Sequence, residues 1–264
     1  MRFRFLPAVV LAGSAAAFVA WAANLPVVTA RPKPGEPYRF FGNRTVTVPL
    51  WIHAPEAERL AIRAEVVQLT SRLSTILSEL DVPFTSGAGT EVDLPVALPA
   101  VKRETNLELR FRSRRPGDAH WQEAGRVALR VYPADLLDPV RAWAQSHAVR
   151  VVEDRGSVME FLRQQNIPVT SKPHPRSVTL YAGPRALQKQ ELRPLRDGEA
   201  AILFTERETE TPHLLIDRTS RGITMRVEMR ILDRLATDPL AQKILLELFQ
   251  RLEEQPSTTE GVVP

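Results

Sequence analysis

Hydrophobic and polar residues alternate in several segments of residues 38–132. In three segments apolar side chains occupy every second position, which is the period of a β-strand with one buried face. These segments are residues 44–52, 107–112 and 127–131. Turn residues such as Pro116 and Gly117 separate the predicted strands. Short alternating strands parted by turns predict an all-β, immunoglobulin-like sandwich over residues 38–132.

The pattern of residues 59–80 fits either a helix or a strand. Apolar residues recur there at spacings of three and four, the period of a helix. They are Ile62, Val66, Leu69, Leu73, Ile76 and Leu80. Over 59–68, however, apolar residues also alternate with Arg63 and Glu65. We interpret 59–68 as a strand followed by a looser segment, because its neighbours are predicted strands. A helix would make this domain α+β and would exclude the sandwich.

In the second half of the chain the apolar pattern changes to the helical period. Asp135 is expected to cap a helix that runs through His147, and Ser157 begins a second amphipathic helix. Asp238-Pro239 opens a third helix, with proline in its first turn.

Short, predominantly apolar runs separate these helices. They lie at residues 149–152, 178–181 and 200–204. Such runs suit strands buried on both faces of a parallel sheet. Residues 214–216 and 223–227 are expected to form a hairpin. Helices that alternate with buried strands predict an α/β domain.

The predicted fold class is therefore multidomain, with an N-terminal all-β immunoglobulin-like sandwich and a C-terminal α/β three-layer, flavodoxin-like domain. The expected division is a signal peptide or signal anchor over 1–22, a proline-rich linker over 23–37, the sandwich over 38–132, the α/β domain over 133–254 and a disordered tail over 255–264. The linker is expected to be stiff and extended because of its prolines.

The N-terminus carries an export pattern. Arg2 and Arg4 precede residues 5–23, which contain no charge. Ala20 and Ala22 then have the A-x-A spacing of a cleavage site. The chain is therefore predicted to be exported to the periplasm or the cell surface. Because the apolar segment approaches the roughly 20 residues that span a bilayer, retention as a membrane anchor is the alternative.

Composition narrows the function classes. The chain has no cysteine, which excludes a lipid-anchored lipoprotein, disulfides and a cysteine nucleophile. The formal charge of +4 falls by two when Arg2 and Arg4 leave with the signal, and the remaining basic residues are interspersed with acids. This distribution argues against nucleic acid as a partner. No cofactor is predicted, because no phosphate-binding loop or metal-ligand spacing is present.

Candidate binding residues follow the three predicted buried strands. Open α/β sheets bind ligands beyond the carboxyl ends of their strands. The loops there contain Arg155, Arg185, Glu206 and Arg207. If the strands are parallel neighbours, these side chains converge on one edge, where helix-opening amides behind Gly156 would favour an anion. An ordinary polar loop surface explains the same residues.

The sequence predicts no catalytic or metal site. It contains no G-x-S-x-G elbow, and Ser157, the nearest candidate nucleophile, suits a turn and helix cap better. The histidines show no metal-binding spacing, and His147 is explained by the end of a helix. Glu206, Glu208 and Glu210 alternate as paired carboxylates of a glycosidase could, but a solvated loop explains them better.

A family resemblance enters at the C-terminal end. The strand 200–204, the segment 222–227 and the helix after Asp238-Pro239 are similar to the closing strands and helix of class I glutamine amidotransferase-like domains. In particular they resemble the non-catalytic versions attached to bacterial sugar-processing proteins. The resemblance covers residues 134–252. The chain lacks the family's cysteine nucleophile and His-Glu pair, so the resemblance implies a relative without amidotransferase activity.

These patterns predict an exported, non-catalytic binding or scaffolding protein of the bacterial cell envelope. Its partner is expected to be an envelope protein or a glycan, the glycan only through the resemblance. Two alternatives stay open. One is a glycan-active hydrolase that uses loop carboxylates such as Glu206 or Glu208. The other is a structural module that binds a partner chain through an exposed sheet edge.

Overall fold

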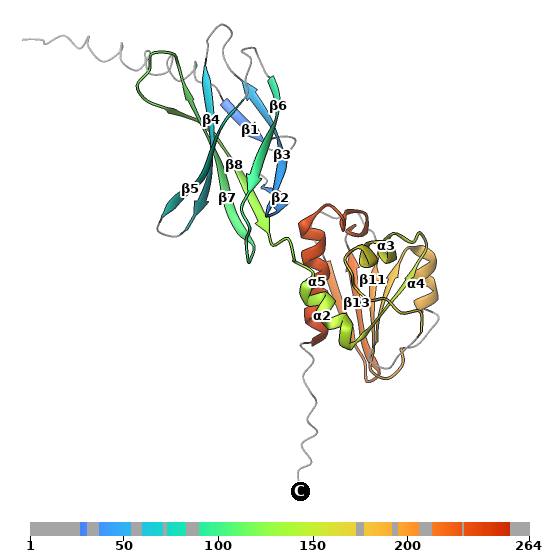
Figure 1. The fold of residues 1–264 in the computed structure, drawn as a ribbon. Coiled ribbons are helices and arrows are strands. Elements are labelled where there is room, and N and C mark those ends of the chain that lie inside the picture. Colours follow the sequence, from blue (N-terminus) through green and yellow to red (C-terminus); the bar gives the residue numbers. More distant parts are fainter. Residues whose placement is uncertain are drawn as a thin grey trace, which may run out of the picture. The chain divides into compact units, whose positions relative to one another are not determined.

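The computed structural model describes most of the chain between residues 27 and 253. The described residues are 27–30, 37–53, 60–70, 73–82, 90–172, 177–191, 195–205, 213–228 and 230–253. The chain divides into two compact units, Met1–Ala134 and Asp135–Pro264, and each is described by itself (Figure 1). The predicted signal segment 1–22 and the predicted tail 255–264 lie outside the described residues.

The N-terminal unit is a sandwich of two β-sheets. Its strands are β1 (Val27–Ala30), β2 (Tyr38–Phe41), β3 (Arg44–His53), β4 (Ala61–Leu69), β5 (Ser74–Asp81), β6 (Thr90–Leu98), β7 (Thr105–Arg114) and β8 (Gln122–Tyr132). One sheet has the order β1-β3-β6 and the other β2-β8-β7-β4-β5. Both sheets contribute side chains to one hydrophobic core, so they pack face to face (blue to green in Figure 1).

The alternating sequence pattern accounts for this core. In β6 Val92 and Leu94 are buried while the residues between and beside them are exposed. In β7 Leu109 and Phe111 are fully buried in the same way. Burial of such side chains contributes roughly 25 cal/mol per Å² of apolar surface, so one face of each sheet is held inside. The strands predicted at 44–52, 107–112 and 127–131 are confirmed as parts of β3, β7 and β8.

The ambiguous segment after residue 59 is a β-hairpin. Strand β4 pairs antiparallel with β7 on one side and with β5 on the other. The strand interpretation of 59–68 is therefore confirmed over 61–68, which lies within β4. The looser segment expected after it is wrong, because Ser74–Asp81 forms β5. The sequence contains both the helical and the strand period. Pairing of β4 with its neighbours β7 and β5 selects the strand.

The β-structure begins inside the segment that composition assigned to a linker. Strand β1 pairs antiparallel with the end of β3, and Val28 is buried in the sandwich core. Gly125 of β8 leaves room for this strand, because a Cβ at Gly125 would overlap the backbone oxygen of Val28. The sandwich thus includes a strand that precedes residue 38.

The C-terminal unit is built on a five-stranded mixed sheet. Its elements are α2 (Asp138–Ser146), β9 (Ala148–Glu153), α3 (Ser157–Gln164), β10 (Ser177–Ala182), α4 (Pro184–Glu191), β11 (Glu199–Phe204), β12 (His213–Arg218), β13 (Gly222–Glu228), the 3-10 helix η1 (Leu232–Arg234) and α5 (Pro239–Glu253). The strand order is β12-β13-β11-β10-β9. Strands β9, β10, β11 and β13 run parallel, and β12 forms the predicted antiparallel hairpin with β13.

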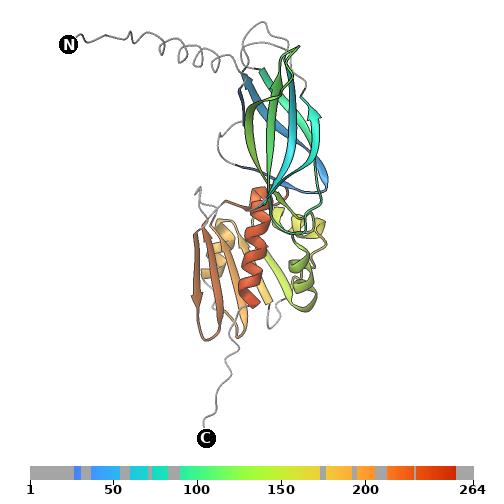
Figure 2. The same ribbon diagram turned by 90° about the vertical axis from the view of Figure 1, so that its left-hand side faces the viewer.

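Helices lie on both faces of this sheet. Helices α2, α3 and α5 share the larger core on one face, and Figure 2 shows α5 (red) lying along that face. Helix α4 packs on the other face, where Ala186 meets Tyr181, Ala201 and Leu203. Strands β10 and β11 are buried along their whole length, as the nearly uniform apolar runs at 178–181 and 200–204 predicted.

The predicted combination of an immunoglobulin-like sandwich with a flavodoxin-like α/β domain is wrong as a fold class. Strands hold 50% of the described residues and helices 22%, in three sheets. The C-terminal sheet is mixed, and β9, β10 and β11 follow one another across it without the reversal of strand order that defines a flavodoxin-like sheet. The sequence pattern indicated buried strands and helices, but it does not contain the order in which strands pair.

The two acidic residues that precede α2 and α5 differ in whether they cap the helix. Asp135 does not cap α2, because the N-cap residue is Leu137 and no side chain bonds to the helix start. Asp238 does cap α5, since the amide of Leu240 donates to its Oδ1 at 2.9 Å. None of the helices in the described part of the chain is both long and apolar enough to cross a membrane.

Replacing Gly125 tests whether β1 belongs to the sandwich. Gly125→Ala is expected to displace β1, because the new methyl group overlaps the Val28 backbone, and to lower the free energy of unfolding by about 1–3 kcal/mol. Amide exchange in Val27–Ala30 should accelerate. Gly117→Ala is the control, since nothing lies within 4 Å of a Cβ there, and it should leave exchange in β1 unchanged. Unaltered protection of β1 in Gly125→Ala would contradict this packing.

Candidate functional site

Three parallel strands end at one edge of the C-terminal sheet. Strands β9, β10 and β11 are parallel neighbours whose last residues, Glu153, Ala182 and Phe204, lie side by side. Arg155 follows β9 and Arg185 opens α4 after β10, so both predicted site residues lie at this edge. The predicted site residues Glu206 and Arg207 lie outside the described residues.

Glu153 occupies the amides that open α3. The backbone N–H of Val158 donates to Oε2 at 2.8 Å, and that of Met159 donates to Oε1 at 2.9 Å. The N-cap residue, Gly156, has a φ of 83° and contributes no capping side chain. A carboxylate in this position also lies at the positive end of the helix dipole. The protein's own anion therefore takes the amides that sequence analysis assigned to an anionic ligand.

Asp154 ties the neighbouring loop to the same edge. Its Oδ2 accepts a hydrogen bond from the backbone N–H of Arg185 at 3.0 Å, and its own N–H donates to the carbonyl of Ala182 at 3.2 Å. Gly183 has a φ of 99°, and a Cβ there would approach Asp154 Oδ2 to 2.7 Å. Arg185 thus serves this edge through its backbone, while its side chain is exposed.

A cavity of about 150 Å³ lies between these loops. Glu153, Asp154 and Asp233 of η1 line it together with Arg155. Ligand pockets usually measure about 300–1,000 Å³, so this one is small. Its wall carries more carboxylates than guanidinium groups, which disfavours an anionic metabolite. Among the described residues, no cluster of histidine and acidic side chains could hold a metal ion.

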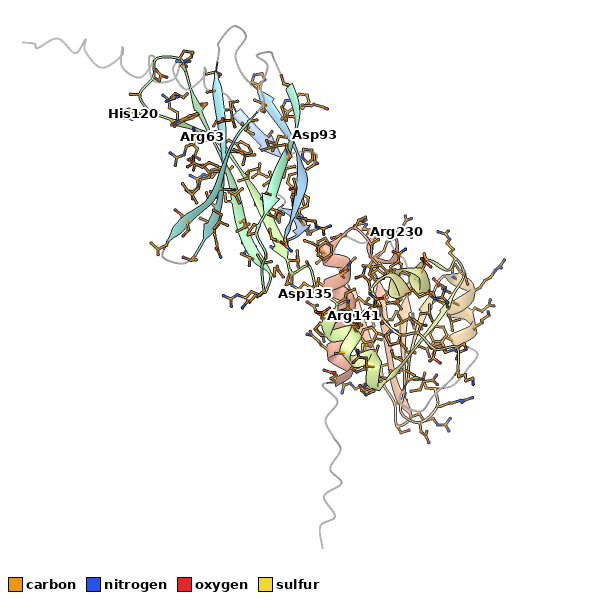
Figure 3. All side chains as sticks on the ribbon, in the orientation of Figure 1. Arg63, Asp93, His120, Asp135, Arg141 and Arg230 are labelled. Carbon is orange, nitrogen blue, oxygen red and sulfur yellow. The ribbon has the colours of Figure 1, made fainter. Side chains whose placement is uncertain are left out.

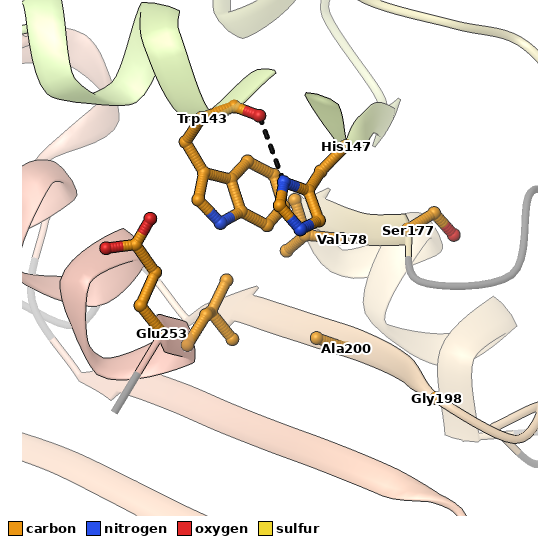
Figure 4. A pocket seen from close by; sticks show the side chains of 8 residues that line it. Trp143, His147, Ser177, Val178, Gly198, Ala200 and Glu253 are labelled. Carbon is orange, nitrogen blue, oxygen red and sulfur yellow. Dashed lines mark hydrogen bonds between the residues drawn. The ribbon is translucent and has the colours of Figure 1, made fainter. Parts of the chain in front are cut away.

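A larger groove of about 450 Å³ lies at the opposite ends of β10 and β11 (Figure 4). Trp143 of α2 and the C-cap residue His147 form one side of it, and Ser177 and Glu253 contribute polar groups. The His147 ring stacks on Trp143 with centroids 4.3 Å apart, and its Nδ1 lies 3.1 Å from the Trp143 carbonyl oxygen. Ser177 is buried, and its Oγ has no hydrogen-bond partner among the residues that the structure describes.

The end of α2 accounts for the position of His147. The residue is the C-cap of α2, and its imidazole lies against the last carbonyl groups of the helix, as its sequence position indicated. One face of the Trp143 indole is covered by His147, and the edge of Phe249 lies 5.1 Å away between ring centroids. The aromatic surface is therefore used mainly inside the protein.

The outer face of the five-stranded sandwich sheet carries a second candidate site, which we call the charged face. Leu107, Leu109 and Phe111 of β7 point into the core, so the residues between them point outward. Paired charges lie at outward positions of β4, β5, β7 and β8 and at Glu104, just before β7. They include Arg63–Glu79 (3.0 Å), Arg112–Glu65 (2.9 Å), Arg110–Glu108 (2.5 Å), Arg126–Glu123 (2.7 Å) and Arg130–Glu104 (3.4 Å). Figure 3 shows Arg63 on this face and Asp93 on the other sheet.

The pair Arg126–Glu123 is bidentate. Arg126 Nε donates to one carboxylate oxygen at 2.7 Å and Nη2 to the other at 2.8 Å. Hydrogen bonds from Arg126 hold the pKa of Glu123 below its usual value, and Glu123 raises the pKa of Arg126 in return. Because both groups are exposed, this pair adds order to the surface rather than much stability.

One aromatic ring is clamped at the end of the charged face. The guanidinium carbons of Arg63 and Arg114 lie 4.7 and 4.8 Å from the centre of the Trp121 ring. Such cation–π contacts contribute about 0.5–1 kcal/mol each at exposed sites. No sequence pattern predicted this clamp. For the charged face as a whole, the alternation of charged residues with apolar ones in 107–112 was the visible signal, and pairing of β4 with β7 brings Arg63 and Glu65 alongside.

No family model and no curated protein matches the chain. Three solved structures resemble parts of it. The sporulation control protein Spo0M from Bacillus subtilis is 10% identical, with a TM-score of 0.30, and the match covers 46% of this chain and 56% of Spo0M. A DUF4784 family protein from Bacteroides caccae is 12% identical, with a TM-score of 0.22, covering 39% and 23%. WR4, an MSP family member from C. elegans, is 10% identical, with a TM-score of 0.21, covering 42% and 99%.

The chain thus spans less than two thirds of the first two proteins it matches. Likeness at these scores carries no argument about function. None of the three is a glutamine amidotransferase-like domain, so that resemblance stays a prediction.

Removing the Glu153 carboxylate tests the cap of α3. Glu153→Ala is expected to lower the free energy of unfolding by about 1–2 kcal/mol, because two helix-opening amides lose their acceptor. Urea denaturation measures the change. Arg155→Ala, two residues on and exposed, is the control and should stay within about 0.5 kcal/mol of the parent. Equal stability of the two variants would show that Glu153 is not needed as the cap.

Proposed function

We propose that this protein is an exported, non-catalytic scaffolding protein of the bacterial cell envelope, and that the charged face of its sandwich binds a partner protein. The observation that carries the proposal is the ordered network of arginine–carboxylate pairs on that face. Exposed ion pairs contribute only about 0–1 kcal/mol each. Their concentration on one sheet face is therefore better explained by binding than by folding.

The composition of the charged face supports a protein partner. Arginine and tryptophan are enriched where proteins bind one another, and Trp121 lies between Arg63 and Arg114. Each arginine is already oriented by a carboxylate or by the indole ring. A partner would find these groups preorganised, which reduces the entropy that binding costs.

The C-terminal unit supports a small-molecule function less well. Glu153 and Asp154 take the amides at the edge where an α/β sheet would hold an anion. In the larger groove, His147 covers one face of the Trp143 ring that would otherwise stack on a sugar. A glycan partner therefore has less support than a protein partner. The hydrolase alternative depends on Glu206 and Glu208, which lie outside the described residues.

Export is tested by following the N-terminal segment. The full chain with a C-terminal tag, produced in a bacterial host, is expected in the envelope fraction, either shortened by about the first 22 residues or intact and membrane-bound. Leu11→Arg puts a charge into the apolar segment and should leave the full-length precursor in the cytoplasm, whereas Leu11→Ile should not. Parent protein that stays unprocessed in the soluble cytoplasmic fraction would refute export.

Binding by the charged face is tested by reversing one of its charges. Arg126→Glu is expected to reduce the yield of a crosslinked envelope partner at least about tenfold. The new carboxylate would repel the partner group that Arg126 attracts and would slow association. Arg218→Glu, an exposed arginine of β12 in the other unit, is the control. Circular dichroism checks that both variants fold. Equal crosslinking of both variants would remove the charged face as the binding surface.

A further inference from the structure

The end of the β4–β5 hairpin carries apolar side chains that the fold leaves exposed. Leu69, Leu73, Ile76 and Leu77 are 45%, 71%, 46% and 40% exposed, and we call this group the hairpin patch. Strand β5 is the last strand of its sheet, so no described strand covers its outer edge. Edge strands are usually protected by charges, yet residues 74–78 carry none.

A β-bulge sets the direction of these side chains. Val66 pairs with Ser78 and Val67 pairs with Ile76, which leaves Leu77 as an extra residue. Cross-strand partners share one face of a sheet. Val66 belongs to the sandwich core, so Val67 and its partner Ile76 lie on the outer face. Leu69, two residues beyond Val67, lies on the same outer face.

The hairpin patch is therefore not an extension of the core. The residues beside it that face inward, Gln68 and its partner Thr75, are polar. Apolar side chains outside and polar ones inside reverse the order expected of a sandwich strand. From the exposed fractions, the patch presents roughly 350 Å² of apolar surface, a size often found at interaction sites.

We propose that the hairpin patch binds a second copy of this chain, with the two β5 strands antiparallel about a two-fold axis near Leu77. The distribution of charge along β5 argues for this partner. Glu79 and Asp81 lie at one end of the strand, and the other end is uncharged. In the antiparallel arrangement the acidic end of each copy meets the uncharged end of the other. A parallel arrangement would set Glu79 against Glu79.

The same features determine how tight the contact is. Two patches together bury well under the roughly 1,200–2,000 Å² of a standard interface, so the dimer is weak and concentration-dependent. The bulge also interrupts the edge at Leu77, which leaves side chains rather than a continuous backbone ladder at the centre. A two-fold contact is self-complementary and closes at two copies. The dimer would present two charged faces, and a partner that engages both gains avidity.

The natural absence of cysteine makes a disulfide test clean. Leu77→Cys places one thiol per chain next to the axis, and mild oxidation is expected to convert most of the protein to a covalent dimer. Leu215→Cys is the matched control, because Leu215 is a 55% exposed leucine on the other unit's edge strand β12. It should crosslink at least about tenfold less, since two chains then meet only by collision. Equal, low crosslinking of both variants overturns the proposal.

Sedimentation velocity over a range of concentrations gives a second, independent measurement. The parent chain, as purified from cells, is expected to shift toward twice the monomer mass as concentration rises. Leu77→Glu sets like charges together at the axis and should raise the dimer dissociation constant about tenfold or more, while Leu215→Glu should not change it. A strictly monomeric parent at every concentration, with no Leu77→Cys dimer, refutes the self-association.

A photo-crosslinking residue at position 77 in living cells separates this inference from the proposed scaffolding function. A self-adduct supports the dimer. An adduct only with a different envelope protein overturns the dimer and leaves the scaffolding function standing. No adduct at position 77 overturns the dimer as well, and the charged-face experiment then decides the scaffolding function by itself.

Discussion

Side chains of a β-strand point alternately to the two faces of the sheet, and the N-terminal unit depends on this constraint. In the sheet β2-β8-β7-β4-β5 one face belongs to the sandwich core, so every second residue must meet water or find other cover. Paired arginines and carboxylates occupy that outer face. Val67 lies among them and is fully buried, which fits cover by the apolar stems of long charged side chains. Core, charged face and hairpin patch are thus three outcomes of one alternation.

The same constraint explains how two adjacent carboxylates serve two different helices. Glu153 ends β9, and Asp154 is the next residue, so their side chains leave the sheet in opposite directions. Helix α3 packs on one face of the sheet and α4 on the other. Glu153 therefore reaches the amides of α3, while Asp154 reaches the start of α4. A single turn of chain fixes both layers of helices to the carboxyl edge and fills the space that a ligand would need.

The sequence revealed local structure well and spatial partners poorly. The short, nearly uniformly apolar runs at 178–181 and 200–204 predicted buried strands, because burial on both faces favours apolar side chains at every position. The order of the strands in the sheet did not follow from the sequence, since parallel pairing is decided by loops and packing rather than by the strand's own residues.

Helix caps were harder to predict than strands. Asp135 had the chemistry of a cap, yet the helix starts at a different residue. Glu153 caps α3 although it precedes Val158, whose N–H donates to it, by five residues. This separation is longer than the three residues of the capping box, so the sequence did not suggest it. The clamp around Trp121 needed three segments to meet, and no local pattern encodes that.

The bulge in β5 has an evolutionary consequence. Every residue of the hairpin from Ser74 to Asp81 has a cross-strand partner in β4 except Leu77. Losing this single codon would leave each remaining pair in place and each remaining side chain on its present face. The leucine is thus the position of the hairpin that strand pairing does not require. Descendants of this chain could discard it without refolding the sheet, so its persistence or loss among them would record selection on the surface alone.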